Sequence, residues 1–352
     1  MNQFHRSSIV LWQVLFASIV FWMIQGIAFG QDEFPIWIKP PALKANDRIA
    51  IVAPSGPVDE KLLRDYAEAL RLQGFQVELP DDIGRKIGYL AGTDEQRAEE
   101  MNRMIRDTRI QAIFPARGGY GLTRILDRID YAFLASHPKV IIGYSDITAL
   151  HLAVARKCRL VTFHSPVPLS NLYREQEQDY RFAAQSFRRA ILKNSYFEKH
   201  SGYVIETPPS MTPKTLVGGK ARGRLLGGNL TLVSSTMGTP YEIETDQAIL
   251  FFEDVNEAPY RIDRMLSQLR LAGKLERVAG IVVGDLQVKT DEERAEIRKI
   301  LVEYFAHLQK PVITDFPCGH IAWNATLPHG AIVELNADLG TLTLLENPVR
   351  IP

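Results

Sequence analysis

The chain has 352 residues, of which 46% are hydrophobic and 23% charged, a composition typical of a folded globular protein and not of a disordered chain. Its 41 basic side chains balance 41 acidic ones, so it lacks the basic field that nucleic acid or an anionic lipid surface normally requires. Neither class of partner is expected.

The first 30 residues differ from the rest because Arg6 is their only charged side chain and residues 9–24 form an apolar stretch. The sequence Ala28-Phe29-Gly30 resembles a small-x-small cleavage site, which predicts a signal peptide over residues 1–30. An uncleaved membrane anchor is the alternative, since the apolar stretch is somewhat long. Both interpretations place the body in the periplasm or outside the cell. Cleavage would leave 40 basic and 41 acidic side chains, a formal charge of −1.

The chain has two cysteines, Cys158 and Cys318, far apart in sequence and without the spacing of a metal site. Export permits a disulfide between them, but we expect two separate thiols.

From Asp47 onward, short apolar runs alternate with longer amphipathic stretches, as in a parallel sheet with helical connections. The pattern predicts strands over 48–53, 76–79, 111–115, 140–143 and 160–163, and helices over 60–73 and 94–106. Several of these strands run into glycine-bearing turns at the sheet edge where open α/β sheets bind ligands. We place an N-terminal α/β domain at residues 45–165.

Residues 166–220 lose this rhythm and are predicted to form a crossover linker with one polar helical piece over 175–192. Residues 221–350 are then predicted to form a C-terminal domain. Its expected elements are strands over 248–252 and 278–283, a helix over 261–271, and later β-like runs. The fold class is α/β, with an N-terminal parallel-sheet lobe and a smaller β-rich C-terminal lobe.

Ser145 follows an apolar strand and Gly143-Tyr144 and directly precedes a helical pattern. A serine on such a turn can be exposed as a nucleophile, with free N–H groups at the helix start for an oxyanion. The second glycine of the G-x-S-x-G pattern is missing, and Ser145 as a simple helix N-cap is the alternative.

Glu253 ends the apolar run 248–252, where a carboxylate is costly unless something binds it. A salt bridge to Arg261 or Arg264 is one explanation, and Asp254 and Glu257 are other acids in the same turn.

His320 lies on a loop after a strand-like run, beside Gly319. Such a histidine can be both exposed and oriented, but His151, His164 and His329 compete for a functional role, with His164 the strongest competitor.

If Ser145, Glu253 and His320 converge, they supply a nucleophile, a base and a carboxylate that orients the base. The turn at Gly118-Gly119 and the Asp146 amide could then stabilise an oxyanion. No G-K-[ST] follows these glycines, so nucleotide binding has little support. No H-E-x-x-H, C-x-x-C pair or aspartate-rich calcium loop is present, so a metal site is not predicted.

Six motifs taken together resemble the LD-carboxypeptidase (muramoyltetrapeptide carboxypeptidase) family of serine peptidases over residues 45–350. In chain order they are IVAPSG at 51–56, ARGGYG at 116–121, GYSD at 143–146, GGNL at 227–230, EDVNEAPYRIDR at 253–264 and GH at 319–320. The resemblance, and not periodicity, selects Glu253 over Asp254 and His320 over His164.

This resemblance implies a Ser-His-Glu triad assembled across two lobes, without a cofactor. The implied reaction releases terminal D-alanine from peptidoglycan tetrapeptides, at a bond that follows an L-configured centre, usually of diaminopimelate. Arg117, Tyr120 and Asn229 stand in the shared motifs and are expected to contact the muropeptide, Arg117 through its terminal carboxylate. A structural ion pair is the alternative for Arg117.

Many members of the family are cytoplasmic and act in cell-wall recycling, whereas this chain carries an export signal. Membrane contact is expected only if that segment is uncleaved, and the resemblance leaves a homodimer open. The competing functions are a muropeptide-binding protein without catalysis, a peptidyl-nucleotide antibiotic-cleaving amidase of the same family, and an amidase or esterase with the same triad.

Overall fold

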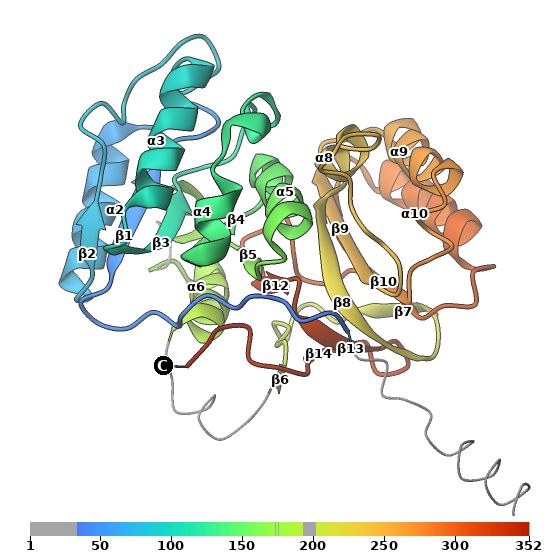
Figure 1. Cartoon of the computed structure of the whole chain (residues 1–352). Helices are drawn as coiled ribbons and strands as arrows, with labels where there is room; N and C mark the ends of the chain where they lie inside the picture. Colours follow the sequence, from blue (N-terminus) through green and yellow to red (C-terminus); the bar gives the residue numbers. More distant parts are fainter. Residues whose placement is uncertain (1–33, 173, 175, 193–201, 352) are drawn as a thin grey trace, which may run out of the picture. The chain divides into compact units, whose positions relative to one another are not determined.

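The N-terminal half is built on a six-stranded sheet in the order β12-β5-β4-β3-β1-β2 (Figure 1). The computed structural model describes residues 34–172, 174, 176–192 and 202–351. Five of the strands are parallel and one is antiparallel. Their bounds are β1 Arg48–Val52, β2 Gln76–Glu78, β3 Ile110–Pro115, β4 Val140–Gly143, β5 Thr162–His164 and β12 Leu327–His329.

Helices cover both faces of this sheet, which explains why its strands read as unbroken apolar runs. One face packs against α3 (Asp94–Arg106), α4 (Tyr131–Ser136) and α5 (Thr148–Cys158). The opposite face packs against α2 (Glu60–Leu72) and α6 (Gln178–Ile191). The predicted parallel-sheet α/β lobe is confirmed, and the bounds of β4 and α3 agree with the prediction residue by residue.

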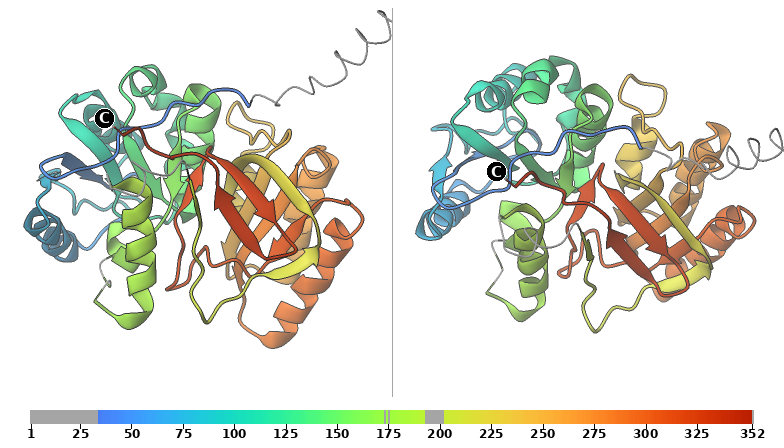
Figure 2. Two further views of the ribbon diagram at one scale, coloured as in Figure 1. Left: turned by 90° about the horizontal axis from the view of Figure 1, so that it is seen from below. Right: turned by 60° about the horizontal axis from the view of Figure 1, so that its bottom comes forward.

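The C-terminal half carries the larger sheet, with eight strands in the order β6-β14-β13-β8-β9-β10-β11-β7. The central strands β8 to β11 are parallel, and the flanking ones are antiparallel. Figure 2 shows β13 and β14, in red, running beside β8. The bounds are β6 Tyr203–Val204, β7 Lys214–Val217, β8 Lys220–Asn229, β9 Ile249–Val255, β10 Gly280–Gln287, β11 Val312–Thr314, β13 Ile332–Asn336 and β14 Thr341–Leu344.

Three helices pack on one face of this second sheet: α8 (Leu230–Ser235), α9 (Pro259–Leu271) and α10 (Asp291–Phe305). The sequence pattern predicted α9 alone as a clear helix, so this half is less exclusively β than expected. Its other face shares one continuous core with the first sheet. Phe251 of β9 and Phe163 of β5, for example, belong to the same cluster.

The segment predicted as a linker, 166–220, belongs partly to each half. Helix α6 packs into the core beneath the first sheet, whereas β6 and β7 lie at the two edges of the second. In the other direction, strand β12 comes from the C-terminal part of the chain and joins the first sheet, where it pairs antiparallel with β5. Each half therefore contains elements from the other part of the sequence, and the two halves share a core.

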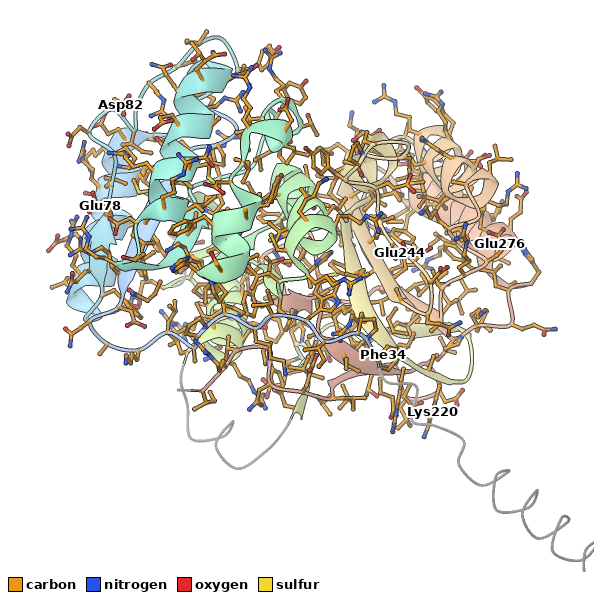
Figure 3. The ribbon with its side chains drawn as sticks, in the orientation of Figure 1. Phe34, Glu78, Asp82, Lys220, Glu244 and Glu276 are labelled. Carbon is orange, nitrogen blue, oxygen red and sulfur yellow. The ribbon has the colours of Figure 1, made fainter. Side chains whose placement is uncertain are left out.

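Charged side chains of both signs lie in both halves, as in the ion pairs Lys61–Asp65 and Lys274–Glu242. Figure 3 labels Glu78 and Asp82 on the N-terminal half and Glu244 on the C-terminal half. Cys158 and Cys318 are separate buried thiols, as expected.

The predicted signal segment, residues 1–30, lies outside the described residues. Within the part of the chain that is described, no helix combines the length and apolarity needed to cross a membrane.

Candidate active site

The turn after β4 holds Ser145 in a strained backbone conformation. Its φ is 61°, in the left-handed region that costs a residue with a side chain roughly 1–2 kcal/mol. Gly143 has a φ of 143°, and a Cβ there would lie 2.6 Å from Ile147 Cγ2, so this glycine permits the turn. The helix then begins as a short 3-10 turn, Ser145–Ile147, before α5.

The alternative that Ser145 is a helix N-cap finds no support. Tyr144 stands at the N-cap of the 3-10 turn and Ile147 at that of α5, and neither helix has a side-chain cap. Among the described residues, the Ser145 hydroxyl has no hydrogen-bond partner. A strained, partly exposed serine with a free hydroxyl is what a nucleophile position requires.

The predicted glycine turn after β3 lies directly over this hydroxyl. A Cβ on Gly118 would lie 3.1 Å from Ser145 Oγ and 3.4 Å from the Asp146 nitrogen, so only glycine allows this approach. Gly119 has a φ of 120°, again a glycine conformation. Across the described residues, the N–H groups of Gly119 and Asp146 donate to no protein acceptor, which leaves both available for an oxyanion.

The Asp146 side chain is buried and links the turns that carry Ser55 and Leu122 through hydrogen bonds. Its Oδ2 accepts hydrogen bonds from Ser55 Oγ at 2.6 Å and from Leu122 N at 3.0 Å, and the residue is 1% exposed. Burial raises the pKa of this carboxyl, although the Ser55 hydroxyl opposes the effect. Ser55 is a supporting residue that the sequence motif contained but that spacing alone could not assign.

Glu253 and His320 meet across the C-terminal half. His320 Nδ1 lies 2.7 Å from Glu253 Oε2, and Glu253 is fully buried. The two glycines beside the carboxylate make room for it, because a Cβ on Gly319 or Gly284 would lie 3.0 or 3.1 Å from Glu253 Cβ. With Nδ1 donating to the carboxylate, Nε2 is left free to accept a proton.

The acids in β9 and in the turn after it have different partners, which distinguishes Glu253 from the two alternatives. Asp254 accepts hydrogen bonds from Asn229 Nδ2 at 3.0 Å and from Thr231 at the start of α8. Glu257 forms an exposed ion pair with Arg261. Glu253 contacts His320 and not the arginines that the sequence offered as partners.

His320 lies beside the turn that carries Ser145. Its ring centroid lies 4.8 Å from that of Tyr144, the residue immediately before Ser145. Within the described residues no hydrogen bond joins Ser145 to His320. Tyr144 is thus a further site residue, whose position in the G-Y-S-D motif was the only sequence signal for it.

The pKa of His320 reflects opposing influences. Burial lowers it, but the hydrogen bond to Glu253 and the negative charges of Glu253, Asp254 and Asp285 outweigh burial and raise it above the usual value. The carboxylates therefore make His320 a stronger base than a free histidine side chain.

The predicted substrate contacts occupy different environments. Arg117 is exposed and donates to Pro57 O at 3.4 Å; in the described part of the chain it has no ion pair, so the structural alternative is unsupported. Tyr120 is 47% exposed, and its ring pairs with Tyr89. Asn229 is buried, caps α8 and donates to Asp254. These three assignments remain predictions.

Asn229 also belongs to the joint between the halves. Its N–H donates to Thr148 Oγ1 at 2.9 Å, three residues beyond Ser145. Gly228 allows the approach, since a Cβ there would lie 2.5 Å from Thr148 Cγ2. The G-G-N motif therefore fixes β8 against the helix that follows the serine.

The three competing histidines lie behind the site, fully buried. His151 Nε2 lies 2.9 Å from Gly143 O, and its ring stacks on His329. Both ring nitrogens of His164 and of His329 lack partners among the described residues. None of the three is paired with a carboxylate, which leaves His320 as the one histidine oriented for base catalysis in the described site.

The three buried histidines should make the folded state less stable in acid. Burial lowers the pKa of His151 from 6.5 to about 4, against an opposing hydrogen bond, and lowers that of His164 and His329 well below 6.5. Because the folded state disfavours their protonation, they contribute stability above pH 6.5 that is lost as the pH falls toward 4. For one buried histidine the loss is about 3 kcal/mol.

Urea unfolding of the wild type between pH 7.5 and 4.5 measures this loss. We expect His329→Gln to flatten the acid slope and exposed His307→Gln to preserve it. Equal slopes in all three proteins would exclude His329 as a source of the acid sensitivity.

Comparisons with known proteins identify the family to which the chain belongs. The LD-carboxypeptidase N-terminal domain matches residues 49–165, and the LD-carboxypeptidase C-terminal domain matches residues 222–335. A relative named probable murein peptide carboxypeptidase, from Bacillus subtilis, is 37% identical over 86% of this chain and 93% of its own. The murein tetrapeptide carboxypeptidase of Pseudomonas aeruginosa is 32% identical over 83% and 94%.

A third relative, the microcin C7 self-immunity protein MccF of Escherichia coli, is 27% identical over 90% of this chain and 97% of its own. A solved structure of MccF superimposes with a TM-score of 0.81 over 89% of this chain and 100% of that one, at 24% identity, which shows a common fold. Two matched domains and two relatives above 30% identity establish the family. The chain belongs to the LD-carboxypeptidase family of serine peptidases and is a hydrolase that acts on peptide bonds.

Proposed function

We propose that the protein is a serine carboxypeptidase that releases terminal D-alanine from peptidoglycan tetrapeptides. The observation that carries the proposal is the hydrogen bond of 2.7 Å between buried Glu253 and partly buried His320, whose imidazole lies beside the turn of a strained serine. The names of the murein carboxypeptidase relatives support the substrate class.

In the proposed mechanism, His320 Nε2 takes the proton of Ser145, and the resulting alkoxide attacks the carbonyl before D-alanine. The oxyanion is stabilised by N–H groups of the Gly118-Gly119 turn and of Asp146. His320 then donates its proton to the leaving amine of D-alanine, which leaves an acyl-enzyme on Ser145. A water molecule, deprotonated by His320, hydrolyses the ester and restores the serine.

The leaving residue carries a free carboxylate, and Arg117 is the proposed group that binds it. Its guanidinium is exposed on the turn that also carries Gly118, so a terminal carboxylate bound there would lie close to the scissile bond. The proposed location is the periplasm or the extracellular space, because of the signal-like residues 1–30. There the enzyme would trim wall peptides outside the cytoplasm.

The second candidate is cleavage of a peptidyl-nucleotide antibiotic, favoured by the structural similarity to MccF. One solved structure of that protein is a complex with glutamyl sulfamoyl guanosine, so a nucleotide analogue occupies a related fold. The same triad would serve both reactions, and the difference would lie in the group after the scissile bond.

The test is to incubate the purified protein with muramoyl tetrapeptides and, separately, with an aminoacyl sulfamoyl nucleoside, and to identify products by mass. We expect free D-alanine and the corresponding tripeptide from the first incubation. Cleavage of the nucleoside substrate alone would favour the second candidate, and binding of the tetrapeptide without release of D-alanine would overturn the proposal.

A further inference from the structure

A fully buried arginine contacts two of the turns around the site. Arg97, on α3, is 0% exposed, and its Nη1 donates to Gly121 O at 2.9 Å and to Pro54 O. Its Nη2 pairs with Asp94, which supplies the negative charge that a buried guanidinium needs. Glycine at position 121 makes room for this approach, since a Cβ there would lie 2.7 Å from Arg97 Nη1. Arg97 therefore links the turn after β1 to the glycine turn after β3.

The carboxylate of Asp146 links the same two turns at the neighbouring residues. Its Oδ2 accepts hydrogen bonds from Ser55 Oγ and Leu122 N, each one residue after a partner of Arg97. Burial raises the pKa of this carboxyl, and the positive charge of Arg97 is among the influences that oppose the effect. A buried cation and a buried anion thus bridge the same pair of turns.

The two bridged turns also contact each other through their backbones. Gly56 N–H donates to Gly118 O at 3.3 Å, and a Cβ on Gly119 would lie 3.3 Å from Gly56 N, so no side chain fits between the turns. In a planar trans peptide the C=O and N–H groups point in opposite directions. Because Gly56 binds the carbonyl of the Gly118–Gly119 peptide, the Gly119 N–H points away from the turn that carries Gly56. Within the described residues this N–H has no protein acceptor.

The direction of the Gly119 N–H therefore depends on how the turn at 54–57 is held. An oxyanion hole lowers the barrier because its donors are already oriented before the reaction begins. Gly119 and Gly121 have φ values of 120° and 137°, and glycines leave a turn with wide backbone freedom unless other contacts restrain it. The hydrogen bonds of Arg97 and Asp146 supply that restraint.

We propose that Arg97 and the Asp146 carboxylate are positioning residues that hold the Gly118–Gly119 peptide over Ser145, with its N–H directed at the oxyanion. Both side chains are buried, at 0% and 1% exposure, and act without touching the substrate. This inference rests on the proposed function, because an oxyanion forms only if Ser145 attacks a carbonyl. It also gives a reason for keeping two buried charges where apolar side chains would pack at lower cost.

The test measures the rate at which a fluorophosphonate labels Ser145, together with kcat and KM for D-alanine release. The phosphoryl oxygen of the reagent gains negative charge as the serine attacks and fluoride leaves, so labelling depends on the oxyanion donors and requires no recognition of a peptide. Urea unfolding of each variant fixes conditions under which the protein stays folded. A role in stability alone would leave both rates of the folded protein unchanged.

Arg97→Lys keeps the charge but replaces the fixed fork of the guanidinium by a single ammonium, which cannot reproduce the contacts to both turns. The labelling rate and kcat should each fall by about 10²-fold, the effect of losing one oxyanion donor or of displacing it by about 1 Å. KM should change by less than about threefold, because the lost interaction belongs to the transition state.

Ser55→Ala is the milder variant, because it removes one of the two hydrogen bonds that Asp146 Oδ2 accepts and leaves both charges in place. It should lower the labelling rate and kcat by about tenfold, again with little change in KM. If Arg97→Lys does not fold, Ser55→Ala decides the question alone.

Asn102→Ala, on the same helix as Arg97, is the matched control. The Asn102 side chain is also buried, but it bridges a different loop, donating to Arg128 O at 2.7 Å and accepting from Asp130 N at 2.8 Å. This variant should unfold at a lower urea concentration than the wild type while keeping the wild-type labelling rate and kcat.

Wild-type rates in Ser55→Ala, or an equal loss in Asn102→Ala, would overturn the inference and leave the proposed function intact. Failure of the wild type to release D-alanine from any tetrapeptide would instead count against the proposed function, and the labelling rates of the variants would still decide the inference.

Discussion

Replacement of Ser145 by alanine is expected to lower kcat for D-alanine release by a factor on the order of 10⁴ to 10⁶, the range seen when a serine nucleophile is removed from a triad. The reason is chemical, because the variant loses the hydroxyl that lies against the Gly118 turn and that is proposed to attack the carbonyl. Alanine meets the same backbone strain at φ 61° as serine does, so the free energy of unfolding should stay within about 1 kcal/mol of wild type.

Two measurements separate this outcome from misfolding. The variant should unfold at nearly the wild-type urea concentration, and it should no longer be labelled by a serine-directed fluorophosphonate. Ser136→Ala, an exposed serine at the end of α4, is the matched control and should retain both turnover and labelling. Undiminished turnover by the Ser145 variant would reassign the nucleophile.

The N-terminal half was predictable from sequence because its physics is local. Each parallel strand is buried on both faces and reads as an apolar run, and each helix has its own amphipathic pattern. The β4 strand matched its predicted bounds for this reason, and α3 has in addition a capping box from Thr93 to Gln96 that marks its start.

The features that escaped prediction depend on distant parts of the chain. Strand β12 has only three residues, one of them Pro328, and becomes a strand because β5 offers an open edge. Helix α10 buries only Ile297, Leu301 and Phe305, so its sequence shows a weak amphipathic pattern. Strand β10 has a bulge at Gly284 and Asp285, which requires a register shift against β9 that no single-strand pattern encodes.

The candidate site also combines features that the local sequence predicts with features that depend on distant residues. The local sequence at Gly143 and Ser145 predicts a sharp turn, and the structure has a positive φ at both residues. The choice of Glu253 among three nearby acids came from family resemblance, because strand alternation tells which acids share a face but not which face meets His320. The contact between Glu253 and His320 depends on the loop after β11, because His320 lies 67 residues further along the chain.

Replacement of Glu253 by glutamine should affect both the rate and its pH dependence. Glutamine keeps the size of the side chain but removes the charge, and its amide can either accept a weaker hydrogen bond from His320 Nδ1 or donate one that favours the wrong tautomer, so kcat should fall by about 10³ to 10⁴, as for the acid of other triads. Without the carboxylate, burial and the remaining charges alone set the pKa of His320, which should fall.

Since His320 acts as a base only when neutral, the acid limb of the kcat/KM profile should move to lower pH in Glu253→Gln even as its plateau drops. A purely structural role for Glu253 would lower the plateau without moving the limb. Glu257→Gln is the matched control, because this acid lies four residues on and pairs with exposed Arg261. It should keep the wild-type profile, and an identical acid limb in all three proteins would show that Glu253 does not set the basicity of His320.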